Sequence, residues 1–257
     1  MEIRREHAET VVELLGRGLV CGLGEPEPGE MCLEALKCYV LGLPHGDDPQ
    51  CEIAAGRDLQ IRLNDAVWSS PTARARGMAR IGIAMLGSRG VLDEAEFVRR
   101  VVDMTIRRAV PVGLRAAAGR NPKHAKALEA AAVRCEQDGT REACEHARTV
   151  ARAYAARSSA AAAAYDAAYD AAYAASAAAD AAYFAAAASA SASAADVADA
   201  AAAYAAADVA DAAADASAAD ARTRDRVLAD YAEWVVQILI DMQAPGCQWL
   251  DLVPVAS

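Results

Sequence analysis

Glycine and proline are both absent from residues 141–244 of this 257-residue chain. These two residues interrupt helices most strongly, whereas alanine, which dominates the stretch, has the highest helix propensity. Aromatic side chains are also scarce, at 5% of the residues with only two Phe. The sequence therefore predicts an all-α protein, a multi-helix bundle in which an alanine-rich portion packs closely because small side chains let helices approach one another.

Long apolar runs are missing as well. No stretch of about eighteen strongly apolar residues occurs, which excludes an ordinary membrane-spanning helix. The first residues, Met1-Glu-Ile-Arg-Arg-Glu-His, are charged and lack the apolar segment of a secretory signal. An odd number of Cys, seven, favours reduced thiols. We therefore expect a cytoplasmic protein with no membrane partner.

Positive charge is absent from residues 158–221, here called the alanine tract. The tract contains nine Asp and no Lys, Arg, Glu or His, while the other 27 of the 36 acidic residues nearly balance the 26 basic ones. A surface of this sign repels phosphates and attracts a basic protein, so it argues against nucleic-acid binding by the tract. The predicted partner surface consists of Asp166, Asp170, Asp180, Asp196, Asp199, Asp208, Asp211 and Asp215.

The alanine tract and the residues that flank it form a stretch too long to be one helix of a compact domain. From Thr140 to Ala244 a single helix would extend about 150 Å at 1.5 Å per residue. We expect two or three helices that fold back on one another. In the absence of glycine and proline, Ser and Asp caps should separate them, at residues 158–159, 189–196 and 217–220.

Helices are also predicted outside the tract. Apolar residues at helical spacing indicate helices over residues 2–19, 30–41, 71–86, 93–110 and 222–242. Ser70 and Asp93 suit the N-cap positions of the third and fourth of these. Residues 43–56 read as an irregular loop, residues 57–68 are ambiguous, and the fourth helix should end before Pro111.

Two regions follow from this pattern. Residues 1–119 form an N-terminal helical region that contains the irregular loop 43–56. Residues 120–257 form an alanine-rich helical bundle, in which the apolar helix after the tract acts as an anchor. The sequence leaves open that both belong to one continuous domain.

The irregular loop holds the residues best suited to chemistry. His45, Cys51, Asp47 and Asp48 could act as a base, a thiol nucleophile and carboxylates. Such residue types also occur together by chance in a loop, so the sequence favours a non-enzymatic protein and keeps catalysis as an alternative.

A zinc site is a second alternative for the same region. Cys32, Cys38, His45 and Cys51 supply three thiols and one imidazole, a set that suits tetrahedral zinc. The five, six and five residues between them exceed the usual two to four, and buried Cys also serve as small apolar residues. We expect no cofactor, with zinc as the alternative.

Basic residues concentrate in the middle of the chain, at Arg74, Arg76, Arg80, Arg99, Arg100, Arg107, Arg108 and Arg115. Such a set can bind nucleic acid, but an arginine-rich helix face is more commonly a solvated surface. Because the alanine tract offers an opposite charge, we expect these arginines to pair with it.

The second half of the chain resembles a known group of proteins. Pro122-Lys-His-Ala-Lys-Ala-Leu-Glu-Ala-Ala, then Asp138-Gly-Thr-Arg-Glu-Ala-Cys-Glu-His-Ala-Arg and the alanine tract, are similar to the alanine-rich immunity proteins of bacterial toxin systems. The first half, with Leu43-Pro-His-Gly-Asp-Asp-Pro and Leu63-Asn-Asp-Ala-Val-Trp-Ser-Ser-Pro, resembles uncharacterised bacterial or phage proteins. The resemblance implies a helical bundle that binds a toxin, and it carries over no functional residue.

The leading interpretation is a non-enzymatic helical module that presents the acidic tract to a basic protein, as an immunity protein would. The alternatives are an enzyme or zinc-stabilised module built on the His45 loop, and a homo-oligomeric scaffold that assembles through alanine faces.

Overall fold

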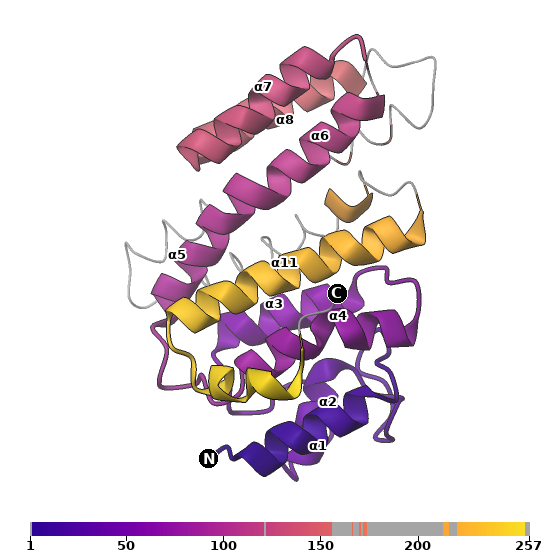
Figure 1. Cartoon of the computed structure of the whole chain (residues 1–257), viewed down its shortest axis with the longest axis vertical. Helices are drawn as coiled ribbons and strands as arrows, with labels where there is room; N and C mark the ends of the chain where they lie inside the picture. Colours follow the sequence, from indigo (N-terminus) through magenta and orange to yellow (C-terminus); the bar gives the residue numbers. More distant parts are fainter. Residues whose placement is uncertain are drawn as a thin grey trace.

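The computed structural model describes residues 2–120, 122–155, 166, 170, 172–173, 213–215 and 220–254. These residues form an all-α bundle without a β-strand, apart from one isolated antiparallel bridge between Gly24 and Met31. Figure 1 shows an elongated arrangement: the first helices lie at one end, α6 to α8 lie at the other, and α11 crosses the middle. The predicted fold class is confirmed.

Four helices build the N-terminal end: α1 (Arg5–Leu15), α2 (Leu33–Val40), α3 (Ala54–Asp65) and α4 (Pro71–Ala84). The cap predicted before α4 is present, because the Ser70 hydroxyl accepts a hydrogen bond from the Ala73 amide at 3.1 Å. Buried apolar side chains from all four helices form one core that α4 crosses.

Helix α3 differs from the prediction. Residues 43–56 were expected to be a loop, yet the helix begins at Ala54. Its buried face contains Leu59 and Leu63 together with the polar Gln60 and Asn64. This mixture weakens the apolar periodicity that marks a helix in a sequence.

The fourth predicted helix continues through Pro111. Asp93 caps α5 (Glu94–Met104) as expected, and the chain then passes through a π-helical turn, η1 (Thr105–Ala109), into α6 (Val110–Arg120). A proline removes a backbone donor, and its ring clashes with the carbonyl four residues earlier, here that of Arg107. The wider turn contains this carbonyl, so the helix accommodates the proline without ending.

Helices α6, α7 (Ala125–Asp138) and α8 (Arg141–Ala155) pack together at the far end (Figure 1). Gly139 ends α7 in the left-handed conformation with a φ of 63°, and the Thr140 hydroxyl accepts a hydrogen bond from the Ala143 amide. The small residues Ala143, Ala147 and Ala151 are fully buried on α8, which brings its backbone close to its neighbours.

Most of the alanine tract lies outside the described residues, including the predicted breaks at residues 158–159 and 189–196. Ala172, Ala213 and Ala214 are helical and buried. At the end of the tract, the Asp220 carboxylate accepts a hydrogen bond from the Thr223 amide at 2.8 Å and caps the next helix, as predicted.

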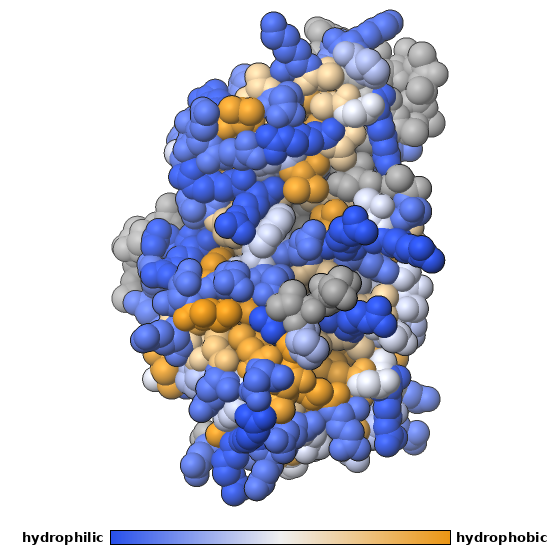
Figure 2. All heavy atoms as spheres, in the orientation of Figure 1, coloured by the Kyte–Doolittle hydropathy of each residue, from blue (hydrophilic) through white to orange (hydrophobic). Residues whose placement is uncertain are grey.

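Helix α11 (Ala221–Asp241) packs on α4 and α5, so the segment after the tract is joined to the N-terminal region. The 3₁₀ segment η2 (Pro245–Leu252) then docks on α4 and α1 and buries Trp249. Figure 2 shows apolar residues gathered on this face around η2, with hydrophilic residues covering much of the rest. No helix among the described residues is long and apolar enough to cross a membrane.

Candidate functional site

A buried ionic cluster joins α2 to α3 and the residues just before it. The Lys37 ammonium donates hydrogen bonds to Glu34 Oε1 at 2.9 Å, Glu52 Oε1 at 2.7 Å and Gln60 Oε1 at 3.0 Å. All four side chains are at most 1% exposed. Burying charges is costly unless they are paired and hydrogen-bonded, so each polar atom in this cluster should have a partner.

The cluster satisfies all but one of its polar atoms. An ammonium has three donors, and Lys37 uses all three on the three partners named above. Gln60 Nε2 donates to Glu52 Oε2 at 2.7 Å and to the Gly56 carbonyl at 3.2 Å. Glu34 Oε2 is buried and has no hydrogen-bond partner among the described residues.

The pKa values of Glu34 and Lys37 are both raised in the cluster, for different reasons. Burial, followed by the nearby charge of Glu52, raises the pKa of Glu34 from 4.5 to about 8. The pKa of Lys37 is also raised: burial lowers it, but the two carboxylates outweigh this effect. The Glu34 carboxyl is consequently poised to change its charge near neutral pH, while Lys37 stays cationic.

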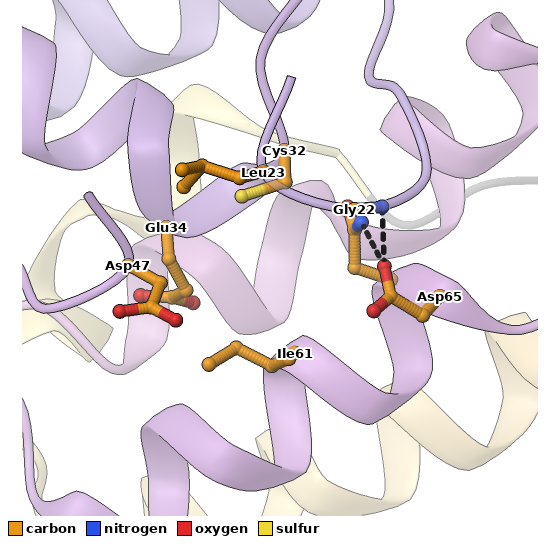
Figure 3. Close-up of a pocket in the computed structure, with 8 residues that line it drawn as sticks. Gly22, Leu23, Cys32, Glu34, Asp47, Ile61 and Asp65 are labelled. Carbon is orange, nitrogen blue, oxygen red and sulfur yellow. Dashed lines mark hydrogen bonds between the residues drawn. The ribbon is translucent and has the colours of Figure 1, made fainter. Parts of the chain in front are cut away.

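Glu34 also lines a cavity of about 110 Å³, here called the Glu34 cavity. In Figure 3 the carboxylates of Glu34 and Asp47 lie on one side of it, and Asp65 lies on the other. Leu23 and Ile61 provide apolar walls. The cavity therefore combines an apolar lining with carboxylates of one sign.

The end of α3 holds the far wall of the cavity in place. Asp65 Oδ1 accepts hydrogen bonds from the Gly22 amide at 2.7 Å and from Asn64 Nδ2 at 3.1 Å, both drawn in Figure 3. Asn64 Nδ2 also donates to the Val20 carbonyl at 2.9 Å. These bonds tie the turn around Gly22 to α3, so the cavity is formed by fixed elements.

The loop residues predicted for catalysis are not arranged as a base and a nucleophile. His45 is exposed, and its Nε2 lies 2.9 Å from the Gly24 carbonyl. Cys51 is buried, and burial raises the pKa of its thiol to about 12, which disfavours the reactive thiolate. Asp48 faces Arg89 and Arg57 in exposed ion pairs.

The four residues predicted for zinc are not brought together as a metal-binding group. Among the described residues no three His, Cys, Asp or Glu side chains lie close enough to hold an ion. Cys32 caps α2, with its sulfur accepting from the Ala35 amide at 3.4 Å, and Cys38 is buried, with a thiol pKa that burial raises to about 12.

The central arginines mostly have partners outside the alanine tract. Arg80 pairs with Glu233, Arg99 and Arg100 pair with Glu96, and Arg107 pairs with Asp103. The predicted pairing of these arginines with the tract stays a prediction, because most of the tract lies outside the described residues.

The remaining arginines of the set, Arg115, Arg74, Arg108 and Arg76, have contacts of several kinds. Arg115 pairs with Glu129 and Glu136. Arg74 donates to backbone carbonyls, and Arg108 lies over the Trp234 ring at 5.7 Å. Arg76 lines a groove of about 930 Å³ between α4 and α11 that carries both signs of charge.

Few residues of the predicted partner surface are described. Asp166 is exposed, Asp170 is half-buried, and Asp215 forms an ion pair with Arg224. The pKa of Asp170 is raised to about 6 by burial, then by the charges of Asp215 and Asp166. The carboxylates of Asp170 and Asp215 are thus close enough to interact. Asp180, Asp196, Asp199, Asp208 and Asp211 lie outside the described residues.

The sequence contained a signal for the buried cluster that composition alone does not reveal. Lys37 lies one turn after Leu33 and beside Leu36, on the buried face of α2. A lysine on an apolar face needs a carboxylate partner, and Glu34, three residues earlier, supplies one. Glu52 and Gln60 could not be assigned in this way, because they meet Lys37 only in the folded chain.

Comparisons with known proteins find no match to this chain among family models, curated proteins or solved structures.

Proposed function

We propose that this protein is a non-enzymatic helical module that binds a basic protein through the acidic face of its alanine tract. The partner class that the sequence resemblance implies is a bacterial toxin, with this chain acting as the immunity protein. The proposal rests on electrostatics.

The observation that carries the proposal is the crowding of like charges around Asp170. Its raised pKa reflects burial and the neighbouring carboxylates of Asp215 and Asp166, which outweigh the opposing charges of Arg120 and Arg224. Like charges that stay close together cost free energy, and a cationic partner would recover it.

The placement of the arginines supports the same proposal. Those of the central set pair largely with carboxylates of their own region, such as Glu96 for Arg99 and Arg100. In the sequence, the excess of negative charge belongs to the tract, which contains nine Asp and no basic residue. A field of one sign accelerates and orients the approach of an oppositely charged protein.

The test compares two variants with equal changes in net charge. Asp166→Asn combined with Asp170→Asn removes two charges from the tract, and Glu25→Gln combined with Glu27→Gln removes two charges from an exposed turn in the N-terminal region. The wild type and both variants are used to capture partners from the native host. The captured protein is then purified, and its affinity for each of the three proteins is measured at two salt concentrations.

We expect a basic partner whose affinity falls with salt and falls about fivefold or more in the tract variant, with little change in the turn variant. A partner that binds both variants equally, or whose binding is independent of salt, would contradict the proposal.

A further inference from the structure

The Glu34 cavity has a feature that the interaction with a basic protein does not use. Glu34 is 1% exposed, and its Oε1 accepts a hydrogen bond from Lys37. Its Oε2 has no partner in the part of the chain that the structure describes, and the residue lines the cavity. A buried acceptor without a partner costs about 1 to 3 kcal/mol, more when charged. A donor inside the cavity would remove this cost.

The charges around the cavity favour a cationic ligand. When ionised, Glu34 and Glu52 carry two negative charges against the single positive charge of Lys37. Asp47 and Asp65 add carboxylates to the cavity lining itself, on opposite sides in Figure 3. An anion or a neutral acceptor would face carboxylates on both sides.

The shape of the lining distinguishes an organic cation from a metal ion. The carboxylates do not converge, since no three His, Cys, Asp or Glu side chains of the described residues lie close enough to share an ion. Leu23 and Ile61 instead offer apolar contact. A cavity of about 150 Å³ accommodates benzene, with six carbons. The Glu34 cavity, at about 110 Å³, therefore fits about four to five non-hydrogen atoms.

We propose that the Glu34 cavity binds a primary ammonium group on a short alkyl stem. The ammonium donates to Glu34 Oε2 and to the carboxylate of Asp47 or Asp65, and the stem lies against Leu23 and Ile61. The same chemistry occurs in a free alkylamine and at the end of a lysine side chain. This inference is independent of the proposed function, because the cavity lies among α2, α3 and the turn around Gly22, in the N-terminal region.

The test is a titration followed by NMR of the methyl groups of Leu23 and Ile61 in the full-length protein. The probes are n-butylammonium, a short peptide with one central lysine, and n-butanol, which has the same stem without the charge. We expect saturable shifts of both methyl groups with butylammonium and none with butanol. Saturation by the peptide would identify lysine side chains as a source, and saturation by the free amine alone would identify small amines.

Three variants and one control, Asp48→Asn, locate the site. Glu34→Gln keeps an acceptor for Lys37 but removes the charge, and it should weaken butylammonium binding about tenfold or more, the effect of losing a charge-assisted hydrogen bond. Asp47→Asn should weaken it several-fold, whereas its neighbour Asp48→Asn, whose carboxylate pairs with Arg89 outside the cavity, should change it less than twofold. Ile61→Phe fills the cavity, so it should abolish binding, followed at the Leu23 methyl groups that remain, even if Glu34→Gln does not fold.

The pH dependence provides a separate readout. Below its raised pKa Glu34 is neutral, so affinity should rise with pH and level off above about pH 8. The charged groups that act on Glu34 are Lys37 in its own helix, Glu52 before α3 and Arg57 in α3, and all are present in each cavity variant. Glu34→Gln should bind weakly at every pH.

The inference is overturned if butylammonium causes no saturable shift at Leu23 and Ile61, or if butanol matches it. Equal binding by the wild type and Ile61→Phe would also overturn it. None of these results bears on the acidic tract, so the two proposals fail separately.

Discussion

Replacing Glu34 by Gln should remove a pH dependence from the stability of the fold. Burial and the charge of Glu52 raise the pKa of Glu34 from 4.5 to about 8. Between these two pH values the folded chain holds a proton that the unfolded chain has released. The free energy of unfolding therefore falls as pH rises through this window, by about 1.4 kcal/mol for each pH unit.

The width of this pH window sets the size of the effect. A single carboxyl group that titrates over the whole window contributes about 5 kcal/mol as an upper bound, because the window spans 4.5 to about 8. Relaxation around the ionised Glu34 reduces this value, so we expect a change of about 2 to 5 kcal/mol. The glutamine side chain of the Glu34→Gln variant is neutral at every pH and contributes no such change.

The measurement is urea unfolding of the wild type and Glu34→Gln between pH 5 and pH 9. The difference between the two free energies of unfolding isolates Glu34, because all other groups titrate in both proteins. We expect the variant to gain stability relative to the wild type as pH rises. Glu13→Gln, an exposed change in α1, serves as the control and should follow the wild type. A difference between wild type and Glu34→Gln that stays constant over this range would refute the reasoning.

Four further substitutions test the packing. Gly77→Ala would place its Cβ 2.3 Å from the Trp68 ring and should destabilise the protein by about 1 to 3 kcal/mol in urea unfolding. Gly119→Ala, whose Cβ would meet no described residue within 4 Å, should be neutral or stabilising. Equal effects of the two would contradict this packing. Thr105→Val removes the 2.8 Å hydrogen bond to the buried Tyr231 hydroxyl and should cost about 1 to 2 kcal/mol. A double-mutant cycle with Tyr231→Phe should show coupling, and strictly additive losses would argue against the bond.

Local chemistry made several helix ends predictable from the sequence. Ser70, Asp93 and Asp220, each just before a helix, are N-cap signals that act within three or four residues. Tertiary packing hardly alters such short-range bonds, so the structure contains them where the sequence predicts them.

The path of the chain through Pro111 was not predictable by the same means. A proline in a helix normally costs about 3 kcal/mol and ends it. Here the π-helical turn of η1 precedes the proline, and Thr105 within that turn bonds to Tyr231 on α11. The exception therefore depends on a helix that lies more than a hundred residues away along the chain.

The candidate site and helix α3 were missed for one physical reason. Gln60 and Asn64 lie on the buried face of α3, so the face that packs inward is partly polar and the apolar periodicity is lost. Gln60 is buried because it completes the shell of Lys37, and Asn64 is buried because it holds the turn beside the cavity. The polar residues that hide the helix in the sequence are those that build the site.

What distinguishes the Glu34 cavity from a purely structural ionic cluster is one buried polar atom, Glu34 Oε2, that lacks a partner among the described residues. Lys37, Glu52 and Gln60 find all their partners among themselves, Glu34 Oε1 and the Gly56 carbonyl, and a network that is closed in this way is a structural element with no room for a ligand. Glu34 Oε2 is the exception in this network, and Glu34 lines the cavity. An unpaired buried carboxylate oxygen is costly, and a donor bound in the cavity, as proposed above, would remove that cost.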